Sequence, residues 1–292
     1  MKFWERFSKT LFKLAAKPRI SRIRSRLLEP VLTNSLSMLD EEMINEIRSF
    51  IISKQTAIGG FADRGGKTDL YYTLFGFYIA EALSVKEVME PLKNYVARLV
   101  TSSNLTGVHR YCGAILYAKL IGLDATSEKL RKQIVADLIK KELKQPEYSG
   151  FMGILALYYL EDYYNIQRAV NQFKRSFYKI GHLPCPVVAA TTLLLGMAGN
   201  RHPEITDLLK TFYRKNGGFA ALHHAPSEDL LSTGVALYAL HFLDADLRLI
   251  KPDCLNFVDN LYDNGGFRST SSDSTTDVEY TFYGLLALGS MS

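Results

Sequence analysis

Six segments of this chain are rich in apolar and aromatic residues and carry few charges. They are apolar around nearly the whole circumference of a helix, which is typical of helices buried on all sides. These segments span 67–84, 108–122, 150–163, 184–199, 229–244 and 276–290. Six more charged segments alternate with them, and there apolar residues recur every three to four positions. The charged segments span 40–55, 87–102, 127–142, 165–178, 203–215 and 247–263. The pattern predicts an all-α protein with twelve helices.

The alternation of two helix types also predicts how the helices are arranged. Helices that are apolar all round belong inside, and one-sided helices belong outside, so six pairs give an inner and an outer layer. Such a series runs as an open solenoid or closes into a ring. The count of six, and an aromatic inner helix at the end of the chain, favour a closed α6/α6 toroid. We expect one toroid at residues 36–292, preceded by an arm at residues 1–35.

A short motif is written three times at the start of these inner segments. It consists of Gly-Gly-Phe, a polar loop, Asp, three residues and Thr. The copies are Gly59-Gly60-Phe61 with Asp69 and Thr73, Gly217-Gly218-Phe219 with Asp229 and Thr233, and Gly265-Gly266-Phe267 with Asp277 and Thr281. A fixed Asp-to-Thr spacing after a loop of variable length indicates a repeated supersecondary unit.

The charge of the chain is concentrated at its beginning. Residues 1–30 carry nine Lys or Arg against two Glu, whereas the remaining chain has 26 basic and 28 acidic residues. Phe3, Trp4, Phe7 and Leu11 fall on one side of a helix with the basic residues on the other, which is typical of a helix lying in a membrane interface. A helix packed on the protein's own surface, or on a partner, fits the same pattern. The body has no matching basic stripe, so we expect no nucleic-acid partner.

The cysteines and the hydropathy bear on the compartment. Cys112, Cys185 and Cys254 are isolated along the chain, so neither a disulfide framework nor a Cys-x-x-Cys metal site is indicated. No stretch of eighteen uncharged apolar residues predicts a spanning helix. We therefore expect a cytoplasmic protein that contacts a membrane peripherally through residues 1–30.

The repeated unit resembles the repeat of protein prenyltransferase β-subunits and of squalene and terpenoid cyclases. The resemblance covers residues 40–292, although the three middle repeats lack the motif. It implies an α/α toroid that handles an isoprenoid in a central cavity. Because the inner helices run parallel, their N-termini gather at one end of this cavity and favour an anion there. The three Asp residues are candidate catalytic groups, with helix capping as the alternative.

The first repeat is similar to the segment of protein prenyltransferases that binds the isoprenoid diphosphate. The resemblance implies this role for Arg64 and Lys67, although in those enzymes the segment lies in a late repeat. Aromatic residues on the inner segments suit a prenyl chain or a carbocation. We take as candidate substrate-binding aromatics Tyr71, Tyr72, Tyr111 and Tyr238.

Two departures from the family motifs concern the chemistry. The zinc site of protein prenyltransferases needs an Asp, a Cys two residues later, and a His just before the Thr of the next repeat. Here Asp229 remains, but Leu231 and Tyr280 replace the Cys and the His, which argues against zinc and against Cys prenylation. The Asp-x-Asp-Asp motif of protonating cyclases and the Asp-Asp-x-x-Asp magnesium motif are absent. No cofactor is therefore assigned, and magnesium stays open.

The residues leave the reaction open. Our candidate catalytic residues are Asp69, Asp229, Asp277 and Tyr280. The first hypothesis is a prenyltransferase-like or cyclase-like enzyme that acts on a prenyl or polyprenyl lipid. The second is a non-catalytic toroid that binds a lipid or a protein partner, and a third is a β-subunit that requires a helical α-partner.

Overall fold

A computed structural model describes residues 23–140, 148–173, 181–197, 199 and 203–292. The predicted amphipathic helix near Phe3 and Trp4 lies outside these residues.

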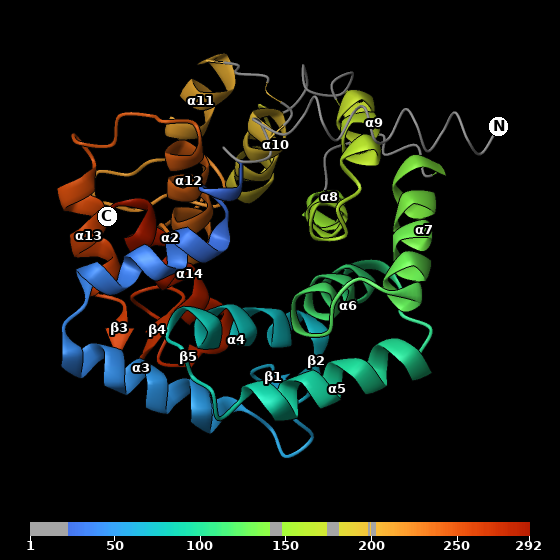
Figure 1. Ribbon diagram of the computed structural model, residues 1–292. Coiled ribbons are helices and arrows are strands. Elements are labelled where there is room, and N and C mark those ends of the chain that lie inside the picture. The colour runs from blue at the N-terminus through green and yellow to red at the C-terminus, as the bar shows by residue number, and fades with distance from the viewer. Residues whose placement is uncertain (1–22, 141–147, 174–180, 198, 200–202) are drawn as a thin grey trace.

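Six helices line the centre of the described structure, and each was predicted from its apolar run. They are α4 (Leu70–Ala82), α6 (Gly107–Leu120), α8 (Tyr148–Tyr159), α10 (Cys185–Met197), α12 (Leu230–Phe242) and α14 (Val278–Ser290). Each packs on the next, and α14 packs on α4, so the series closes into a ring (Figure 1). The closed all-α toroid is confirmed.

The outer layer consists of the more polar helices of each pair. They are α3 (Glu41–Lys54), α5 (Met89–Ser102), α7 (Ala125–Lys140), α9 (Tyr163–Phe173), α11 (Pro203–Lys210) and α13 (Lys251–Asp259). The last two are shorter than the predicted segments. The chain after α11 turns at Phe212 and pairs Tyr213 with Phe219, and the chain after α13 enters strand β3 (Tyr262–Asp263).

Short hairpins connect an outer helix to the following inner helix where the motif is present. Strands β1 (Phe61–Ala62) and β2 (Thr68–Asp69) pair before α4, and β3, β4 (Gly266–Arg268) and β5 (Thr276–Asp277) pair before α14. Phe61 lies opposite Asp69, Phe267 opposite Asp277, and Phe219 bridges to Asp229. Each hairpin therefore places the motif's Phe beside its Asp at the start of the inner helix.

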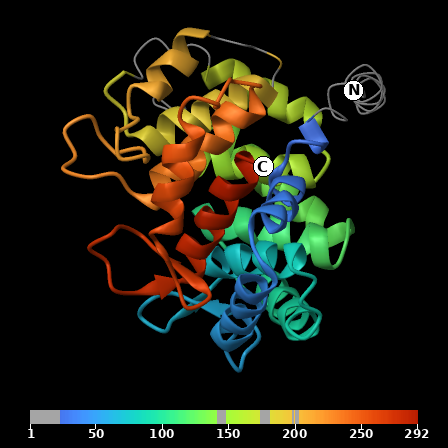
Figure 2. The same ribbon diagram turned by 90° about the vertical axis from the view of Figure 1, so that its left-hand side faces the viewer.

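One further helix, α2 (Leu28–Ser35), is followed by the 3₁₀ turn η1 (Leu36–Met38). It packs on α14 and α4, and the Glu29 carboxylate accepts hydrogen bonds from Lys119 and Tyr159, near the C-terminal ends of α6 and α8. Figure 2 shows the loops before α12 and α14 on one side of the ring and α2 on the other. The described part of the arm thus covers the end of the ring opposite the hairpins.

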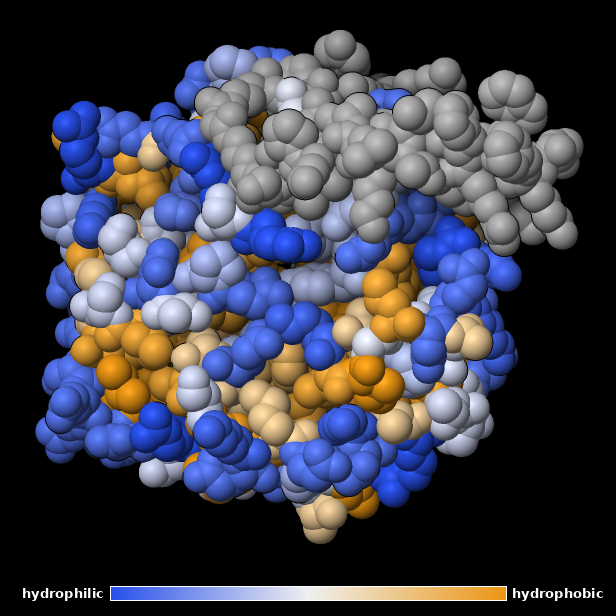
Figure 3. Space-filling model, viewed as in Figure 1, coloured by the Kyte–Doolittle hydropathy of each residue, from blue (hydrophilic) through white to orange (hydrophobic). Residues whose placement is uncertain are grey.

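The surface on the α2 side is mixed. Figure 3 shows hydrophilic residues across the middle of this face with apolar areas beside them. Among the described residues, the exposed large apolar side chains are Ile52, Ile58, Ile121, Leu123 and Leu249. No helix in the described ranges is long and apolar enough to cross a bilayer.

Candidate functional site

The three motif aspartates begin three of the inner helices as N-caps. The carboxylates of Asp69, Asp229 and Asp277 accept the backbone N–H three residues later, each at 2.8 Å. Capping satisfies a helix N–H that has no intrahelical partner and places a negative charge at the positive end of the helix dipole. One oxygen of each carboxylate is committed to this role, and a catalytic role for the three stays a prediction.

The motif threonines tie each Phe to its helix. The Thr233 hydroxyl accepts the N–H of Phe219 at 2.9 Å and donates to the carbonyl of Asp229 at 2.7 Å. Thr73 and Thr281 make the same pair of bonds in the other two copies. The four-residue Asp-to-Thr spacing is therefore the spacing that lets one hydroxyl bridge hairpin and helix.

The first glycine of each motif lies directly against the next outer helix. Gly265 has φ +83°, and a Cβ placed on it would lie 2.5 Å from the carbonyl oxygen of Glu46 in α3. Gly59 and Gly217 repeat this arrangement against the backbones of α5 and α13. Only glycine fits here, because both the left-handed conformation and the close backbone approach exclude a side chain.

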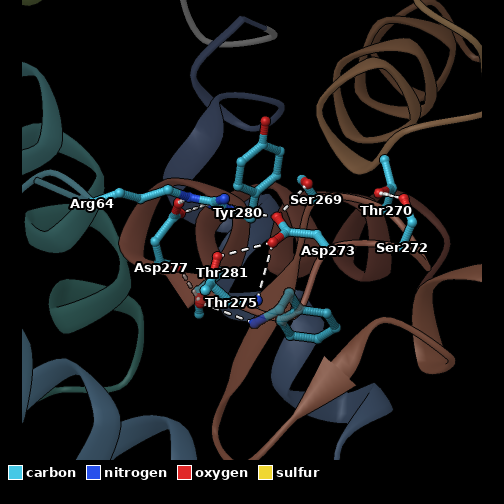
Figure 4. A network of polar contacts seen from close by, with 10 residues as sticks. Arg64, Ser269, Thr270, Ser272, Asp273, Thr275, Asp277, Tyr280 and Thr281 are labelled. Atoms are coloured by element: carbon cyan, nitrogen blue, oxygen red, sulfur yellow. Dashed lines mark hydrogen bonds and ion pairs between the residues drawn. The ribbon is translucent and has the colours of Figure 1, made fainter.

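The hairpins surround one end of the ring, which we call its mouth. At this mouth, Arg64 connects the first hairpin to the last. Its guanidinium binds Asp273 at 2.8 Å and also binds Asp277, while it lies 5.1 Å from the ring centre of Tyr280 (Figure 4). Burial alone would raise the pKa of Asp273, but hydrogen bonds from Arg64 and Ser269 hold it well below its usual value. Asp273 and Asp277 therefore already neutralise Arg64.

Glu279 is a site residue that the sequence reasoning missed. It lies in the first turn of α14, and its carboxylate accepts a hydrogen bond of 2.8 Å from the hydroxyl of Tyr71 in α4. Burial chiefly raises the pKa of Glu279, and the charge of Asp277 adds to this shift. The spacing Asp277-x-Glu279 was the available signal, because it places an acid at the motif position where the family's zinc-binding repeat has Cys.

The centre of the ring is apolar and narrow. It contains a cavity of about 50 Å³ lined by Leu28, Leu74, Phe75, Tyr78, Tyr148, Phe151, Met152, Leu155, Pro186, Ala190, Leu193, Val235, Tyr238, Phe282, Tyr283 and Leu286. Pockets that hold drug-sized ligands measure about 300–1,000 Å³. A prenyl chain therefore enters only if some of these side chains move.

The family comparison agrees with this architecture. A model of the prenyltransferase alpha-alpha toroid domain matches residues 31–112, 114–262 and 185–292. The chain belongs to this family. No match was found among curated proteins or among solved structures.

The toroid places the other predicted substrate-binding residues in different surroundings. Tyr238 lines the cavity, whereas Tyr71 and Tyr72 lie at the mouth beside Glu279. Tyr111 is buried near Arg110 and Asp137 and does not line the cavity. The Lys67 side chain is exposed on the first hairpin.

The residues at the family's zinc positions do not fit zinc in this toroid. Leu231 supplies no ligand, and the Tyr280 ring faces Arg64, with burial chiefly raising its pKa to about 12. His223, a histidine in the loop before Asp229, stacks on Phe212 with the two ring centres 4.0 Å apart. In the part of the chain that the structure describes, no three His, Cys, Asp or Glu side chains lie close enough to share a metal ion.

Proposed function

We propose that this protein is an isoprenoid-handling enzyme that holds a prenyl or polyprenyl chain in the central cavity of the toroid. The observation that carries the proposal is the apolar, aromatic lining of this cavity beside a mouth that bears Arg64, Glu279 and several tyrosines. Apolar walls favour the hydrocarbon chain, and aromatic ring faces stabilise a carbocation formed along it.

In this proposal the head of the substrate lies near the first hairpin. Arg64 and Lys67 contact an anionic head such as a diphosphate. Because Asp273 and Asp277 already bind Arg64, the diphosphate has to displace at least the Asp273 carboxylate, which is the more exposed partner. Asp69, Asp229, Asp277 and Tyr280 remain the candidate catalytic groups around the head.

Calorimetric titration with geranylgeranyl diphosphate tests this assignment. We expect saturable binding to the wild type, and at least tenfold weaker binding to Arg64→Ala and Lys67→Ala. Arg248→Ala is the control, since among the described residues this exposed Arg pairs with Asp246 two positions away and lies on neither hairpin. Equal affinities for all four proteins would remove Arg64 and Lys67 from the site, provided that thermal melts show each variant folded.

A second function is a non-catalytic toroid that binds a lipid or a protein partner. The small cavity and the neutralised Arg64 favour this alternative. Native mass spectrometry of the purified protein separates the two. A co-purified lipid that is returned unchanged after incubation supports carriage, and conversion of an added isoprenoid supports the enzyme.

The remaining partners are proposals that rest on sequence. Residues 1–30 would contact an anionic membrane surface, and sedimentation with anionic lipid vesicles, with and without residues 1–22, tests this contact.

A helical protein partner is tested by light scattering, because a stable monomer with full activity argues against an obligatory subunit. Magnesium is tested by repeating the titration with the ion and with a chelator.

A further inference from the structure

The loop between strands β4 and β5 contains one charged residue. It spans residues 269–276 and reads Ser-Thr-Ser-Ser-Asp-Ser-Thr-Thr, so Asp273 is its single charge. The loop lies at the mouth of the ring, and the residues on both sides of Asp273 are exposed. The Asp273 side chain, by contrast, is only 14% exposed and points toward Arg64 on the first hairpin (Figure 4). The single charge of an exposed loop therefore binds the opposite hairpin.

The Asp273 carboxylate also organises the loop. One of its oxygens accepts the N–H and the hydroxyl of Thr275, at 3.0 and 2.9 Å. The other accepts the hydroxyl of Ser269 and the guanidinium of Arg64. The Asp273 N–H donates to the carbonyl of Thr270 at 3.1 Å. Because one carboxylate makes both sets of bonds, a change in its contact with Arg64 also changes the hydrogen bonding of the loop.

Of the two carboxylates on Arg64, one is fixed by the fold and the other is exchangeable. The Asp277 side chain is 7% exposed, and its second oxygen caps α14, so the helix sets its position. Asp273 lies on the exposed loop, and the Arg64 side chain that it binds is 39% exposed. A partly exposed ion pair is weak, because water and salt screen its charges. Asp273 is therefore the partner that another anion can replace.

The charges at this contact do not favour a second anion while the loop is in place. Arg64 contributes one positive charge and the two aspartates contribute two negative charges, so the group as a whole is negative. Removing Asp273 takes away one negative charge and frees N–H groups of the guanidinium. A free guanidinium edge binds a phosphate through two parallel hydrogen bonds. The loop therefore covers the feature of Arg64 that a diphosphate needs.

We propose that the loop at residues 269–276 is an autoinhibitory lid, in which Asp273 occupies the side of Arg64 that a diphosphate binds. The site fills when a diphosphate displaces Asp273 and the loop moves away, while Asp277 keeps its bond to Arg64. No covalent bond is made or broken. This inference rests on the proposed function and adds the regulation of that same site.

Another arginine–aspartate pair in the chain serves as a matched control. Arg248 binds Asp246 at 2.7 Å, and both side chains are exposed in the loop between α12 and α13. Asp246→Asn and Asp273→Asn remove the same charge, and each releases an arginine from a carboxylate. Only Asp273→Asn does so at the mouth of the ring. An effect of net charge alone would be the same in both variants.

Calorimetric titrations of the full chain with inorganic pyrophosphate and with geranylgeranyl diphosphate test the lid. Asp273→Asn keeps the size of the side chain and an oxygen for the Thr275 N–H, and thermal melts check that each variant is folded. We expect Asp273→Asn to bind both probes at least tenfold more tightly than the wild type, and Asp246→Asn to bind them as the wild type does. In a protein that also carries Arg64→Ala, Asp273→Asn should bring no gain, because the released guanidinium is missing.

Hydrogen exchange gives a second readout, which needs no change to Asp273. The Thr275 N–H is bonded to Asp273, and the Asp273 N–H to Thr270, so exchange at these amides reports on the closed loop. We expect saturating geranylgeranyl diphosphate to speed exchange in residues 269–276 of the wild type, because the lid opens as the diphosphate binds. Arg64→Ala should speed it without any ligand. An aspartate that only shaped the loop would give neither change.

The results that overturn the lid differ from those that overturn the proposed function. Where the wild type binds, equal or weaker binding by Asp273→Asn, or a gain that persists with Arg64→Ala, overturns the lid alone. The same gain in Asp246→Asn, or unchanged exchange of the loop at saturation, also overturns the lid alone. If neither the wild type nor Asp273→Asn binds either probe, the proposed function fails, and this inference falls with it.

Discussion

At the scale of single residues, the threonine of each motif holds the hairpin to the inner helix. Thr233 accepts a buried backbone N–H and donates to a helix carbonyl, so its hydroxyl satisfies two groups at once. Replacing the hydroxyl with a methyl group of the same size removes both bonds while the packing is kept. The Phe219 N–H is then left buried without a partner.

We predict that Thr233→Val lowers the free energy of unfolding by about 1–3 kcal/mol, the usual cost of an unsatisfied buried polar group. Urea unfolding measures this loss. Thr233→Ser keeps the hydroxyl and should retain most of the stability. Equal stability of the Val and Ser variants would show that the hydroxyl is not what holds the hairpin.

The stability of the folded protein should depend on pH through Asp229. Burial chiefly raises its pKa above the ordinary value of 3.8, so the folded protein binds this proton more tightly than the unfolded chain. The stability from this group is complete below pH 3.8 and is lost as pH rises through the folded pKa. Asp229→Asn keeps an oxygen for capping but does not titrate.

The difference in melting temperature, Asp229→Asn minus wild type, should therefore become more positive as pH rises from 4 to 7. Asp229→Ala should melt below Asp229→Asn at both pH values, because the cap is lost at a cost of about 0.5–2 kcal/mol. A constant difference between wild type and Asp229→Asn across this range would mean that Asp229 is not buried as described.

At the scale of elements, the glycine turns hold the outer helices against the hairpins. Gly265 and Gly66 both have positive φ, but only Gly265 approaches another backbone, whereas a Cβ on Gly66 would meet nothing within 4 Å. Alanine at either position lowers the free energy of unfolding by about 1–2 kcal/mol, because its side chain disfavours the left-handed conformation. Alanine at position 265 must also push α3 away.

Gly265→Ala should therefore lose at least twice as much unfolding free energy as Gly66→Ala, in matched chemical denaturation curves. Equal losses would show that α3 shifts at no cost and that the contact between α3 and the last hairpin is loose.

The helices could be predicted from the sequence because a helix buried on all sides is apolar all round, whereas an outer helix is apolar on one side only. The six inner helices were predicted in place, and the Asp-to-Thr spacing reflects bonds made within one hairpin and helix. Arg64 is different. The two carboxylates that bind it, Asp273 and Asp277, lie more than 200 positions away in the sequence. The first and last hairpins meet only because the ring closes.

Other parts of the site were missed for the same reason. Glu279 faces Tyr71 only because α14 packs on α4, and no local pattern reports that contact. Tyr111 was expected at the cavity, but a helix that is apolar all round does not show which side faces the centre. The orientation of α6 decides it, and Tyr111 lies near Arg110 and Asp137.

At the scale of the whole molecule, the ring has two unlike ends. The hairpins gather capped helix N-termini, Arg64 and Glu279 at one end, and α2 covers the other, where Leu28 completes the lining of the cavity. Contacts between the first and last repeats close the ring at both layers, through Arg64, the pair Tyr71–Glu279 and the pair Tyr262–Glu46. We propose that this closed ring holds an isoprenoid chain in its apolar centre.

Calorimetric titration of geranylgeranyl diphosphate into the wild type and Ala190→Leu measures whether the ring centre holds such a chain. Ala190 lines the cavity from α10, and three added carbon atoms would fill much of its 50 Å³. We expect saturable binding by the wild type and at least tenfold weaker binding by the filled variant, with both proteins folded. Equal affinities, or no binding by the wild type, would contradict it.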